Sequence, residues 1–394
     1  FGCIPVKSVF LGNPDKKDLL RFNSNEIKAD TNCFIFKNPD SPGLSKLKVN
    51  DWSTDIPFFI NLNDLATKHK IRSFLVIQND TLKYEYHNKK LQRDALHSSY
   101  SIAKSFISAL IGIAIEEGLI KSVNESVTAY IPELKEIGGD YDPENISIKH
   151  LLTHTSGLPR EAPMPMWSSL KFPDIEEIVK NIETQKIYYK PGRRYKYSNL
   201  GMNLAGKIIE IVSGQEYEKY IKEKILTPLT MNNSGFYPME NVVQGYGIQK
   251  NNKRPTVPLT NTNGYNAAAG LVTNAKDLSK FIFWQFRCIN GECDNIINTN
   301  TLKEMQKVHW MPSNKNIHPI IMKPFVFLSR IMHPSGQGIG FEIYKNYIGH
   351  GGLISGYASE IFIDQKNKIG IIVLANNSDA PIYNWNKNSI SRII

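Results

Sequence analysis

Two groups of strands are predicted from the pattern of apolar and polar positions. The first is a hairpin in which residues 74–78 and 81–86 flank the turn dipeptide Asn79-Asp80. The second group lies near the other end of the chain, at residues 338–345, 357–364 and 369–376. The most economical arrangement of these strands is one antiparallel sheet built from both terminal regions.

Residues 100–117 have a different pattern, because their apolar side chains surround almost the whole circumference of a helix. Gly118 follows at the position of a C-terminal cap. A helix that is apolar on all sides lies either in a domain core or in a membrane. Its first turns carry the polar residues Ser101, Lys104, Ser105 and Ser108. These residues and the limited length of the segment favour a buried central helix over a membrane span.

The stretch between the two groups of strands is mainly helical. Amphipathic segments broken by Pro and Gly occupy residues 174–186, 202–225 and 274–286. The predicted fold class is therefore α+β, with an antiparallel sheet from about 51–118 and 335–394 and a helical insert at about 119–334. Residues 1–50 are polar, with Pro and Asn throughout, and we interpret them as an N-terminal extension.

Composition and charge add limits to this picture. The chain has 394 residues, of which 41% are apolar, and it can therefore bury a substantial core. Its 47 basic and 37 acidic residues leave a net charge of +10, which would suit an anionic partner. However, the basic residues occur in ones and twos, and the sequence contains no nucleic-acid-binding motif. We expect a generally basic surface, no nucleic-acid partner and no membrane-spanning segment.

Two of the four cysteines are close in sequence, in Cys288-Ile-Asn-Gly-Glu-Cys293, where Asn-Gly favours a turn. Such a turn would bring the thiols together, and a disulfide there would imply an oxidising compartment. Two unrelated thiols are the alternative. Because the chain begins with Phe1 rather than Met, we expect that a leader has been removed, with Cys3 as a candidate for lipid attachment. These features predict a periplasmic or secreted protein, anchored to a membrane if Cys3 is acylated.

The candidate chemistry begins with the pattern Ser-x-x-Lys, which occurs three times. The copies at 45–48 and 168–171 lie in or beside Pro-rich segments, which do not hold the two side chains together. Only Ser101 and Lys104 lie at the start of a strong helix, where residues i and i+3 share a face. This copy is therefore the candidate catalytic pair.

The apolar surroundings of that helix disfavour a charged ammonium group and lower the pKa of Lys104. A neutral amine beside a hydroxyl group can act as the general base that makes Ser101 a nucleophile. The free N–H groups at the start of the helix favour the negative charge that develops during such a reaction. The alternative is a surface lysine whose stem lies along a buried helix.

Two further segments add candidate groups. Tyr197 can pass a proton to a leaving group, and Asn199 can hydrogen-bond a substrate carbonyl or hold the lysine. The segment His350-Gly351-Gly352 ends one predicted strand and precedes another. Its paired glycines allow a substrate backbone to approach closely, and His350 can supply a donor near a substrate carboxylate or leaving group. An ordinary turn histidine is the alternative at that position.

The segments Ser101-Ile-Ala-Lys104, Tyr197-Ser-Asn199 and His350-Gly-Gly352 occur in the order and approximate spacing of serine β-lactamases and penicillin-binding proteins. The sequence resembles that family over about residues 60–380. The resemblance is to the branch that holds class C β-lactamases, D-amino-acid peptidases and esterases. Leu151–Leu158 and Ala267–Leu271 resemble further landmarks of the family, and the stretch 101–157 is similar to relatives of 6-aminohexanoate-dimer hydrolase.

The resemblance implies a serine hydrolase that cleaves an amide or ester through an acyl-enzyme on Ser101, without a cofactor or metal. In that scheme Lys104 takes the serine proton, and Tyr197 relays a proton to the leaving group and later activates water. The backbone N–H groups of Ser101 and Leu353 form the oxyanion hole. Asn199 positions the substrate and the lysine.

One difference from the family affects the substrate. β-Lactamases usually carry Lys-Thr-Gly where this chain has His350-Gly351-Gly352, and that lysine helps to bind the substrate carboxylate. We therefore expect weak or no β-lactamase activity, with His350 and Gly352 as candidates for contact with another small or peptide-like substrate. Esters, D-amino-acid peptides and linear amides all stay open.

Other functions fit the sequence less well. A zinc enzyme could use His150 and His154, but no Glu follows His150 and no third ligand lies nearby. A Ser-His-Asp α/β-hydrolase would be expected to contain Gly-x-Ser-x-Gly, which is absent from the sequence. A penicillin-binding receptor or sensor, which is acylated but turns over slowly, remains as the alternative from another functional class.

Overall fold

The computed structural model describes residues 48–51, 58–79, 81–88, 92–162, 171–247, 253–311, 336–344, 347–354 and 356–377. Its main feature is a seven-stranded sheet with the strand order β11-β12-β13-β14-β15-β3-β4. Every neighbouring pair of strands in this sheet is antiparallel. The α+β class and the antiparallel sheet predicted from the sequence are therefore confirmed.

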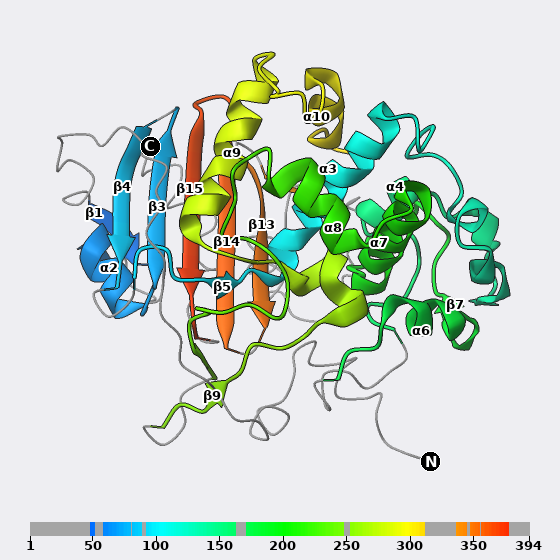
Figure 1. Cartoon of the computed structure of the whole chain (residues 1–394), viewed down its shortest axis with the longest axis horizontal. Helices are drawn as coiled ribbons and strands as arrows, with labels where there is room; N and C mark the ends of the chain where they lie inside the picture. The colour runs from blue at the N-terminus through cyan, green and yellow to red at the C-terminus, as the bar shows by residue number, and fades with distance from the viewer. Residues whose placement is uncertain are drawn as a thin grey trace.

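The sheet joins the two ends of the chain. Its N-terminal hairpin consists of β3 (Ser73–Gln78) and β4 (Thr81–His87). The later part of the chain supplies β11 (Gly336–Gln337), β12 (Glu342–Ile343), β13 (Ile348–Ile354), β14 (Tyr357–Asp364) and β15 (Ile369–Ala375). Because β15 pairs directly with β3, strands from opposite ends of the sequence lie side by side (Figure 1).

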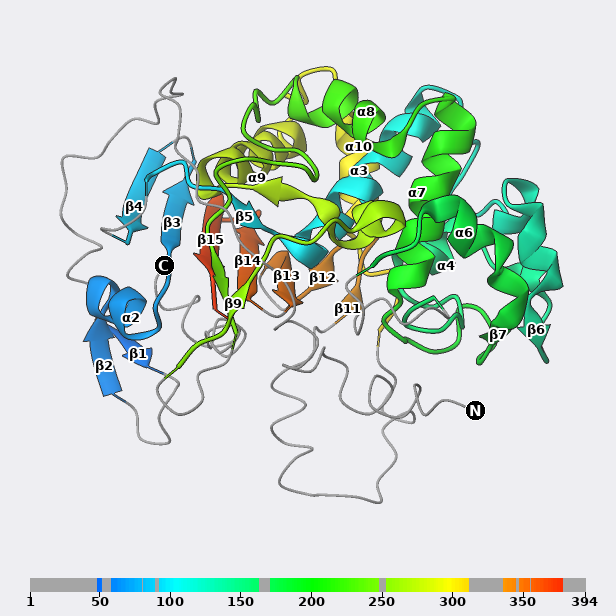
Figure 2. The same cartoon turned by 60° about the horizontal axis from the view of Figure 1, so that its bottom comes forward.

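The two faces of the sheet belong to two apolar clusters, because successive side chains of a strand point to opposite sides. In β3, Leu75 packs into the large cluster that includes the helices, whereas its neighbour Phe74 packs into the smaller one. α3 (Ala103–Glu116) and α9 (Ala275–Ile289) contribute to the large cluster. α2 (Leu62–Lys68) contributes to the small cluster and lies at the β3–β4 end of the molecule (Figure 2).

A mainly helical region occupies the middle of the chain beside the sheet (Figures 1 and 2). Its further α-helices are α4 (Ile148–Leu152), α6 (Ile175–Lys180), α7 (Asn199–Ser213), α8 (Tyr217–Ile221) and α10 (Thr299–Met305). The short strands are β1 (Lys48–Asp51), β2 (Phe58–Asn61), β5 (His97–Ser98), β6 (Gly138–Gly139), β7 (Lys186–Ile187), β8 (Gly245–Tyr246), β9 (Thr256–Val257) and β10 (Val272–Thr273). Single turns of 3₁₀ helix occur at Tyr100–Ile102, Val127–Ala129, Pro132–Glu136, Pro143–Asn145, Ile182–Thr184 and Asn263–Tyr265, and π turns at Lys222–Leu226 and Asn266–Gly270.

The predicted central helix is confirmed, but two predicted helices are too long. The segment 174–186 contains α6 only as far as Lys180, and Lys186 already belongs to β7. The segment 202–225 is interrupted at Gly214, which has a left-handed φ of 65° and caps α7. Glycine adopts that conformation without steric cost, and it therefore ends the helix inside a continuous amphipathic pattern.

The strand predictions need correction around β13. The segment 338–345 is not one strand, since only β12 within it pairs with β13, and Gly340 adopts a φ of 70°. The segment 350–352, predicted as a junction between strands, lies inside β13. The glycines in this segment interrupt the run of apolar residues by which a strand is predicted. Their backbones nevertheless pair with β14.

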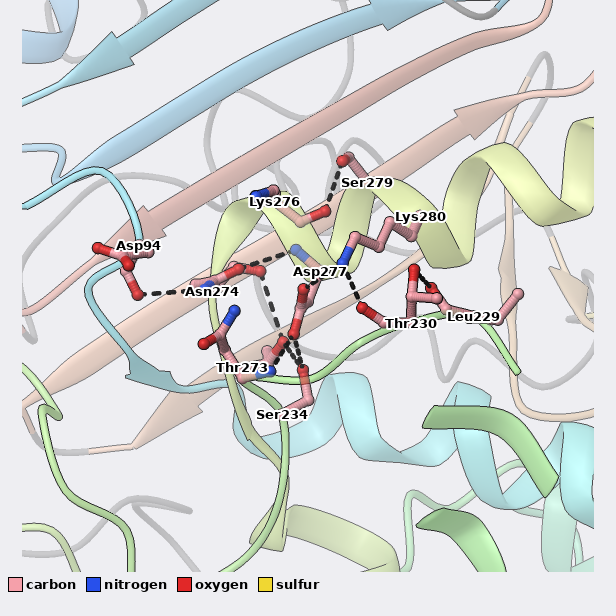
Figure 3. A network of polar contacts seen from close by, with 11 residues as sticks. Asp94, Leu229, Thr230, Ser234, Thr273, Asn274, Lys276, Asp277, Ser279 and Lys280 are labelled. Carbon is pink, nitrogen blue, oxygen red and sulfur yellow. Dashed lines mark hydrogen bonds and ion pairs between the residues drawn. The ribbon is translucent and has the colours of Figure 1, made fainter. Parts of the chain in front are cut away.

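A buried polar network at the start of α9 fixes the strand that precedes the helix. Figure 3 shows the fully buried Asp277 beside Lys280, whose Nζ donates to Asp277 Oδ1 over 3.0 Å. Asn274 caps α9 by accepting from Asp277 N, and its Nδ2 donates to Asp94 O. The same chain segment forms β10, which pairs with β5 just before Ser101. The network therefore supports the backbone that leads to the candidate nucleophile.

Cys288 and Cys293 form a disulfide at the end of α9. None of the helices in the described parts of the chain has the length and apolar character required to cross a membrane. The predicted extension 1–50, apart from the residues of β1, and the predicted lipid site Cys3 lie outside the described residues.

Candidate active site

Ser101 lies in the 3₁₀ turn that leads into α3, and distant segments hold that turn in place. The backbone N–H and the Oγ of Ser99 both donate to Leu271 O, over 2.9 and 2.7 Å. Ser359 Oγ in β14 donates to Ser99 O over 2.7 Å. Tyr100 adopts a φ of 45°, which costs free energy for a residue with a side chain. The surrounding bonds thus keep a strained turn in one conformation.

Strand β13 passes directly beside this turn. A Cβ atom added at Gly352 would lie only 2.1 Å from Ser99 O and 3.0 Å from Ser101 N, so only glycine fits there. Leu353 is the next residue of β13 and is half-buried. The backbones of Ser101 and Leu353, which were predicted to form an oxyanion hole, therefore belong to two neighbouring segments.

Lys104 lies one turn into the helix and is completely buried. Its Nζ donates to Ser101 Oγ over 3.0 Å and to Ala268 O over 2.7 Å. Both acceptors are neutral, and burial lowers the pKa of the Lys104 amine well below its ordinary value. The approach of Glu161 opposes this shift only in part. The amine is thus placed to accept a proton from Ser101.

Tyr197 comes from the loop that precedes α7 and reaches the same serine. Its Oη donates to Ser101 Oγ over 2.8 Å. Burial raises the pKa of this phenol, so the hydroxyl keeps its proton at neutral pH. The Lys104 Nζ lies 4.9 Å from the centre of the Tyr197 ring. Amine, phenol and serine hydroxyl therefore form one contiguous cluster.

Two residues that the sequence did not single out for catalysis hold the Tyr197 ring. His154 stacks on it, with ring centres 4.3 Å apart, and His154 Nδ1 accepts from the backbone N–H of Ser198 over 3.1 Å. The guanidinium of Arg160 lies 4.9 Å from the centre of the same ring. His154 is buried, which lowers the pKa of its imidazole well below the ordinary value. A neutral imidazole therefore supports the phenol.

One predicted role of Asn199 was to hold Lys104. Within the described residues, the hydrogen bonds of Lys104 Nζ go to Ser101 and Ala268 instead. Asn199 Nδ2 donates to Glu161 Oε1 over 2.7 Å, while its Oδ1 is buried without a hydrogen-bond partner. Burial raises the pKa of Glu161, and the ion pair with Arg160 opposes that shift. The carboxyl group thus fixes which way the Asn199 amide points.

His350 lies inside β13, with its ring centre 6.4 Å from that of Tyr197. Its Nδ1 lies 3.0 Å from Gly351 O, and because a carbonyl only accepts, Nδ1 carries the ring proton. Burial lowers the pKa of His350 to about 3. The ring is therefore neutral and presents Nε2 as an acceptor, in contrast to the donor expected from the sequence.

His154, Arg160 and Glu161 could not be assigned to the site from the sequence alone. His154 lies within a segment that resembles a family landmark, and Arg160 and Glu161 follow it in a loop without periodicity. Their contacts to Tyr197 and Asn199 depend on the pairing of distant loops, for example Lys196 N donating to His154 O. A pattern along one segment cannot reveal such a contact.

The histidine pair considered for zinc has other partners. The side chain of His150 takes part in the capping box of α4, and His154 Nδ1 faces the backbone of Ser198. Within the described ranges, no three His, Cys, Asp or Glu side chains are grouped as metal ligands would be.

Comparison with known proteins decides the family. The sequence model of the beta-lactamase family matches residues 68–383. The chain belongs to the beta-lactamase family. The family resemblance predicted for about residues 60–380 is thereby confirmed. Family and fold are those of serine hydrolases of the β-lactamase and penicillin-binding-protein type.

Individual relatives of this beta-lactamase-family chain are distant. Protein flp of Staphylococcus aureus (strain MW2) is 26% identical over 315 residues, which cover 78% of this chain and 58% of that protein. The chain thus spans little more than half the length of this relative. The penicillin-binding protein homologue from Pyrococcus abyssi, an octamer, is 28% identical with a TM-score of 0.64, over 80% of this chain and 72% of that one. A D-stereospecific amidohydrolase from Streptomyces sp. shares the fold, with a TM-score of 0.66 at 19% identity over 83% and 96% of the two chains.

Proposed function

We propose that this protein hydrolyses an amide or ester bond through an acyl-enzyme on Ser101. The observation that carries the proposal is the double contact of Ser101 Oγ, 3.0 Å from the Lys104 amine and 2.8 Å from the Tyr197 hydroxyl. A serine hydroxyl is a weak nucleophile until a base removes its proton. Because Lys104 has no carboxylate among its hydrogen-bond partners in the described residues, its amine can be neutral and can serve as that base.

The proposed reaction has two halves. Ser101 Oγ attacks the substrate carbonyl while its proton passes to Lys104 Nζ, and a tetrahedral intermediate forms. The proton then reaches the leaving nitrogen or oxygen through the Tyr197 hydroxyl as the old bond breaks. Water attacks the acyl-enzyme in the second half, with its proton taken by the same groups, and Ser101 regains a proton from them.

The negative charge on the carbonyl oxygen is stabilised by the backbone N–H groups of Ser101 and Leu353 in this proposal. Preorganised donors of this kind are worth about 3 kcal/mol each. The contact between Gly352 and the Ser99–Ser101 turn supports the role, because it brings the two backbones together. Tyr100, in its strained conformation, lies between Ser99 and Ser101 and helps to fix the direction of the Ser101 N–H.

The proposed substrate is a small or peptide-like ester or amide rather than a β-lactam. His350 stands where β-lactamases have a lysine, and its neutral ring cannot replace an ammonium group as partner of a substrate carboxylate. The fold shared with a D-stereospecific amidohydrolase keeps D-amino-acid amides among the candidates. We also propose a periplasmic or secreted location, which the Cys288–Cys293 disulfide supports.

The decisive experiment is hydrolysis of p-nitrophenyl acetate by the Ser101→Ala variant. We expect kcat/KM to fall at least about 10³-fold, because the covalent route is lost. Ser105→Ala is the matched control, since Ser105 is a buried serine of the same helix whose Oγ donates to Gly340 O. It should keep activity within a few-fold, with folding of both variants checked by circular dichroism.

Retained activity in Ser101→Ala would overturn the nucleophile assignment. The amount of p-nitrophenol released separates the enzyme from the receptor: release well beyond one equivalent supports hydrolysis. If release of the leaving group stops at one equivalent for esters, D-amino-acid amides and linear amides alike, the protein is better described as a receptor that stays acylated. Efficient turnover of nitrocefin would contradict the role given to His350.

A further inference from the structure

A group of basic and tyrosine side chains lies in the segment that runs from β7 to the residue before Tyr197. We define this basic tyrosine patch as Lys186, Tyr188, Tyr189, Lys190, Arg193, Arg194 and Lys196. In sequence it contains no more than two adjacent basic residues. Folding brings the residues together because the segment reverses at Pro191-Gly192, where Gly192 adopts a φ of 79°.

The cations of the patch lie on the tyrosine rings. Lys186 Nζ and Lys196 Nζ are 5.1 and 4.4 Å from the centre of the Tyr188 ring. Arg194 Cζ is 4.4 Å from the centre of the Tyr189 ring. Tyr188 itself is 43% exposed. Three like charges therefore share two neighbouring rings at the surface, although like charges repel one another.

No carboxylate within the described residues compensates these charges. None of the five basic side chains of the patch forms an ion pair there. Elsewhere in the same structure, exposed lysines do form such pairs, as Lys135 does with Glu144 over 3.0 Å. The pKa of Lys196 is lowered by burial and then by the charge of Arg194. A surface that collects uncompensated positive charge is suited to an anionic partner.

The patch stands on a fixed backbone. β7 at its start pairs with β6. The N–H groups of Tyr188, Gly192 and Lys196 donate to carbonyl oxygens of Gly157, Thr155 and His154 in the neighbouring loop. Figures 1 and 2 both show β7 at the end of the molecule opposite to β4. The charges are thus held at one end of the molecule.

We propose that the basic tyrosine patch is a docking surface for an anionic lipid bilayer. Basic side chains near an anionic membrane and tyrosines at its interface both favour such binding. Single-stranded nucleic acid would use the faces of aromatic rings for base stacking. Here Lys186 and Lys196 lie over Tyr188 and Arg194 over Tyr189, so these rings are already engaged by cations. The geometry therefore favours a lipid surface.

The test is co-sedimentation of the full chain with vesicles in 100 mM NaCl. Vesicles of phosphatidylcholine with about 30% phosphatidylglycerol are compared with vesicles of phosphatidylcholine alone. We expect binding to the anionic vesicles only. Each basic residue near such a surface contributes roughly a fivefold gain in binding, so the variant Lys186→Gln/Lys190→Gln/Arg193→Gln/Arg194→Gln should lose about 100-fold or more.

The matched control changes the net charge equally at other sites. Lys121, Lys219, Lys303 and Lys366 are exposed lysines in separate parts of the chain. Their replacement by Gln should reduce binding only a few-fold.

Equal losses in both variants, or no binding of the wild type to anionic vesicles, would overturn the proposal. Binding of a labelled single-stranded oligonucleotide that only the patch variant loses, without vesicle binding, would assign the patch to nucleic acid. Hydrolysis of p-nitrophenyl acetate serves as the check that both variants are folded.

Discussion

Two buried lysines of this protein are surrounded in opposite ways. Lys280 in α9 faces the Asp277 carboxylate over 3.0 Å and also donates to Thr230 O (Figure 3). Lys104 in α3 donates only to the Ser101 hydroxyl and the Ala268 carbonyl among the described residues. Both lie within the first turns of a long helix and both are largely shielded from water.

The difference shows how one side-chain type can take two roles. A carboxylate stabilises an ammonium group inside a protein, so the pair in α9 serves to join the Thr230 loop to the helix. Neutral partners do not offset the free-energy cost of burying a charge, and the affinity of the amine for its proton falls instead. The partner set, more than the depth of burial, separates a structural lysine from a candidate base.

Removal of Asp277 should produce the largest effect on stability. Asp277→Ala leaves Lys280 buried beside no carboxylate and also removes the acceptor of Ser234 Oγ and Asn233 N. Breaking a buried pair on one side costs about 3–5 kcal/mol. The free energy of unfolding from urea denaturation measures this loss. An exposed ion pair provides the control. Glu304→Ala removes the carboxylate that faces Lys307 and should cost about 0.5 kcal/mol or less.

Replacement of the two lysines should separate their roles in activity. Lys104→Met removes the proposed base and should lower kcat for p-nitrophenyl acetate by about 100-fold or more. Lys280→Met should change kcat per folded molecule only a few-fold, because the hydrogen bonds of Lys280 Nζ go to Thr230 O and Asp277 rather than to Ser101 or Tyr197. Equal turnover in the two variants would remove Lys104 from the proposed mechanism.

A third prediction concerns the pH dependence of stability. The pKa of Lys104 is lowered in the folded protein and near its ordinary value of 10.5 in the unfolded chain. Between these two values the unfolded chain binds a proton that the folded protein does not. The free energy of unfolding therefore rises with pH there, by up to about 1.4 kcal/mol per pH unit, and levels off above 10.5.

Urea denaturation of the wild type and Lys104→Met from pH 7 to about 9.5 isolates this contribution. The wild type should gain stability relative to the variant as the pH rises. Parallel curves would mean that Lys104 keeps its proton when the protein folds, and the comparison with Lys280 would then lose its basis.

The sequence predicted those elements of the fold whose signal is local. The hairpin β3–β4, the helix α3 and the strands β14 and β15 each come from one continuous segment rich in apolar residues. β13 was missed because its glycines dilute the apolar signal, and Gly352 is a glycine for a tertiary reason, the closeness of Ser99 O. The end of α7 at Gly214 was missed because the amphipathic pattern continues beyond it.

The site could be predicted in part for the same reason. Ser101 and Lys104 share one helical turn, so their contact follows from spacing alone. The approach of Tyr197 rested on the family resemblance, since a contact between residues 96 positions apart leaves no local pattern. Glu161 as partner of Asn199 and the gathering of Lys186 with Lys196 depend on how loops pair, which no single segment reveals.

The pairing of β15 with β3, and of Ser359 with Ser99 across 260 residues, has a consequence for the protein during its synthesis. The turn that presents Ser101 is made early, but the strands that brace it leave the ribosome late. A nascent chain that has passed α9 therefore still lacks β13 and the contact at Gly352. Shorter nascent chains therefore lack the strands that hold the proposed nucleophile Ser101 in place, and we expect them to be inactive toward p-nitrophenyl acetate.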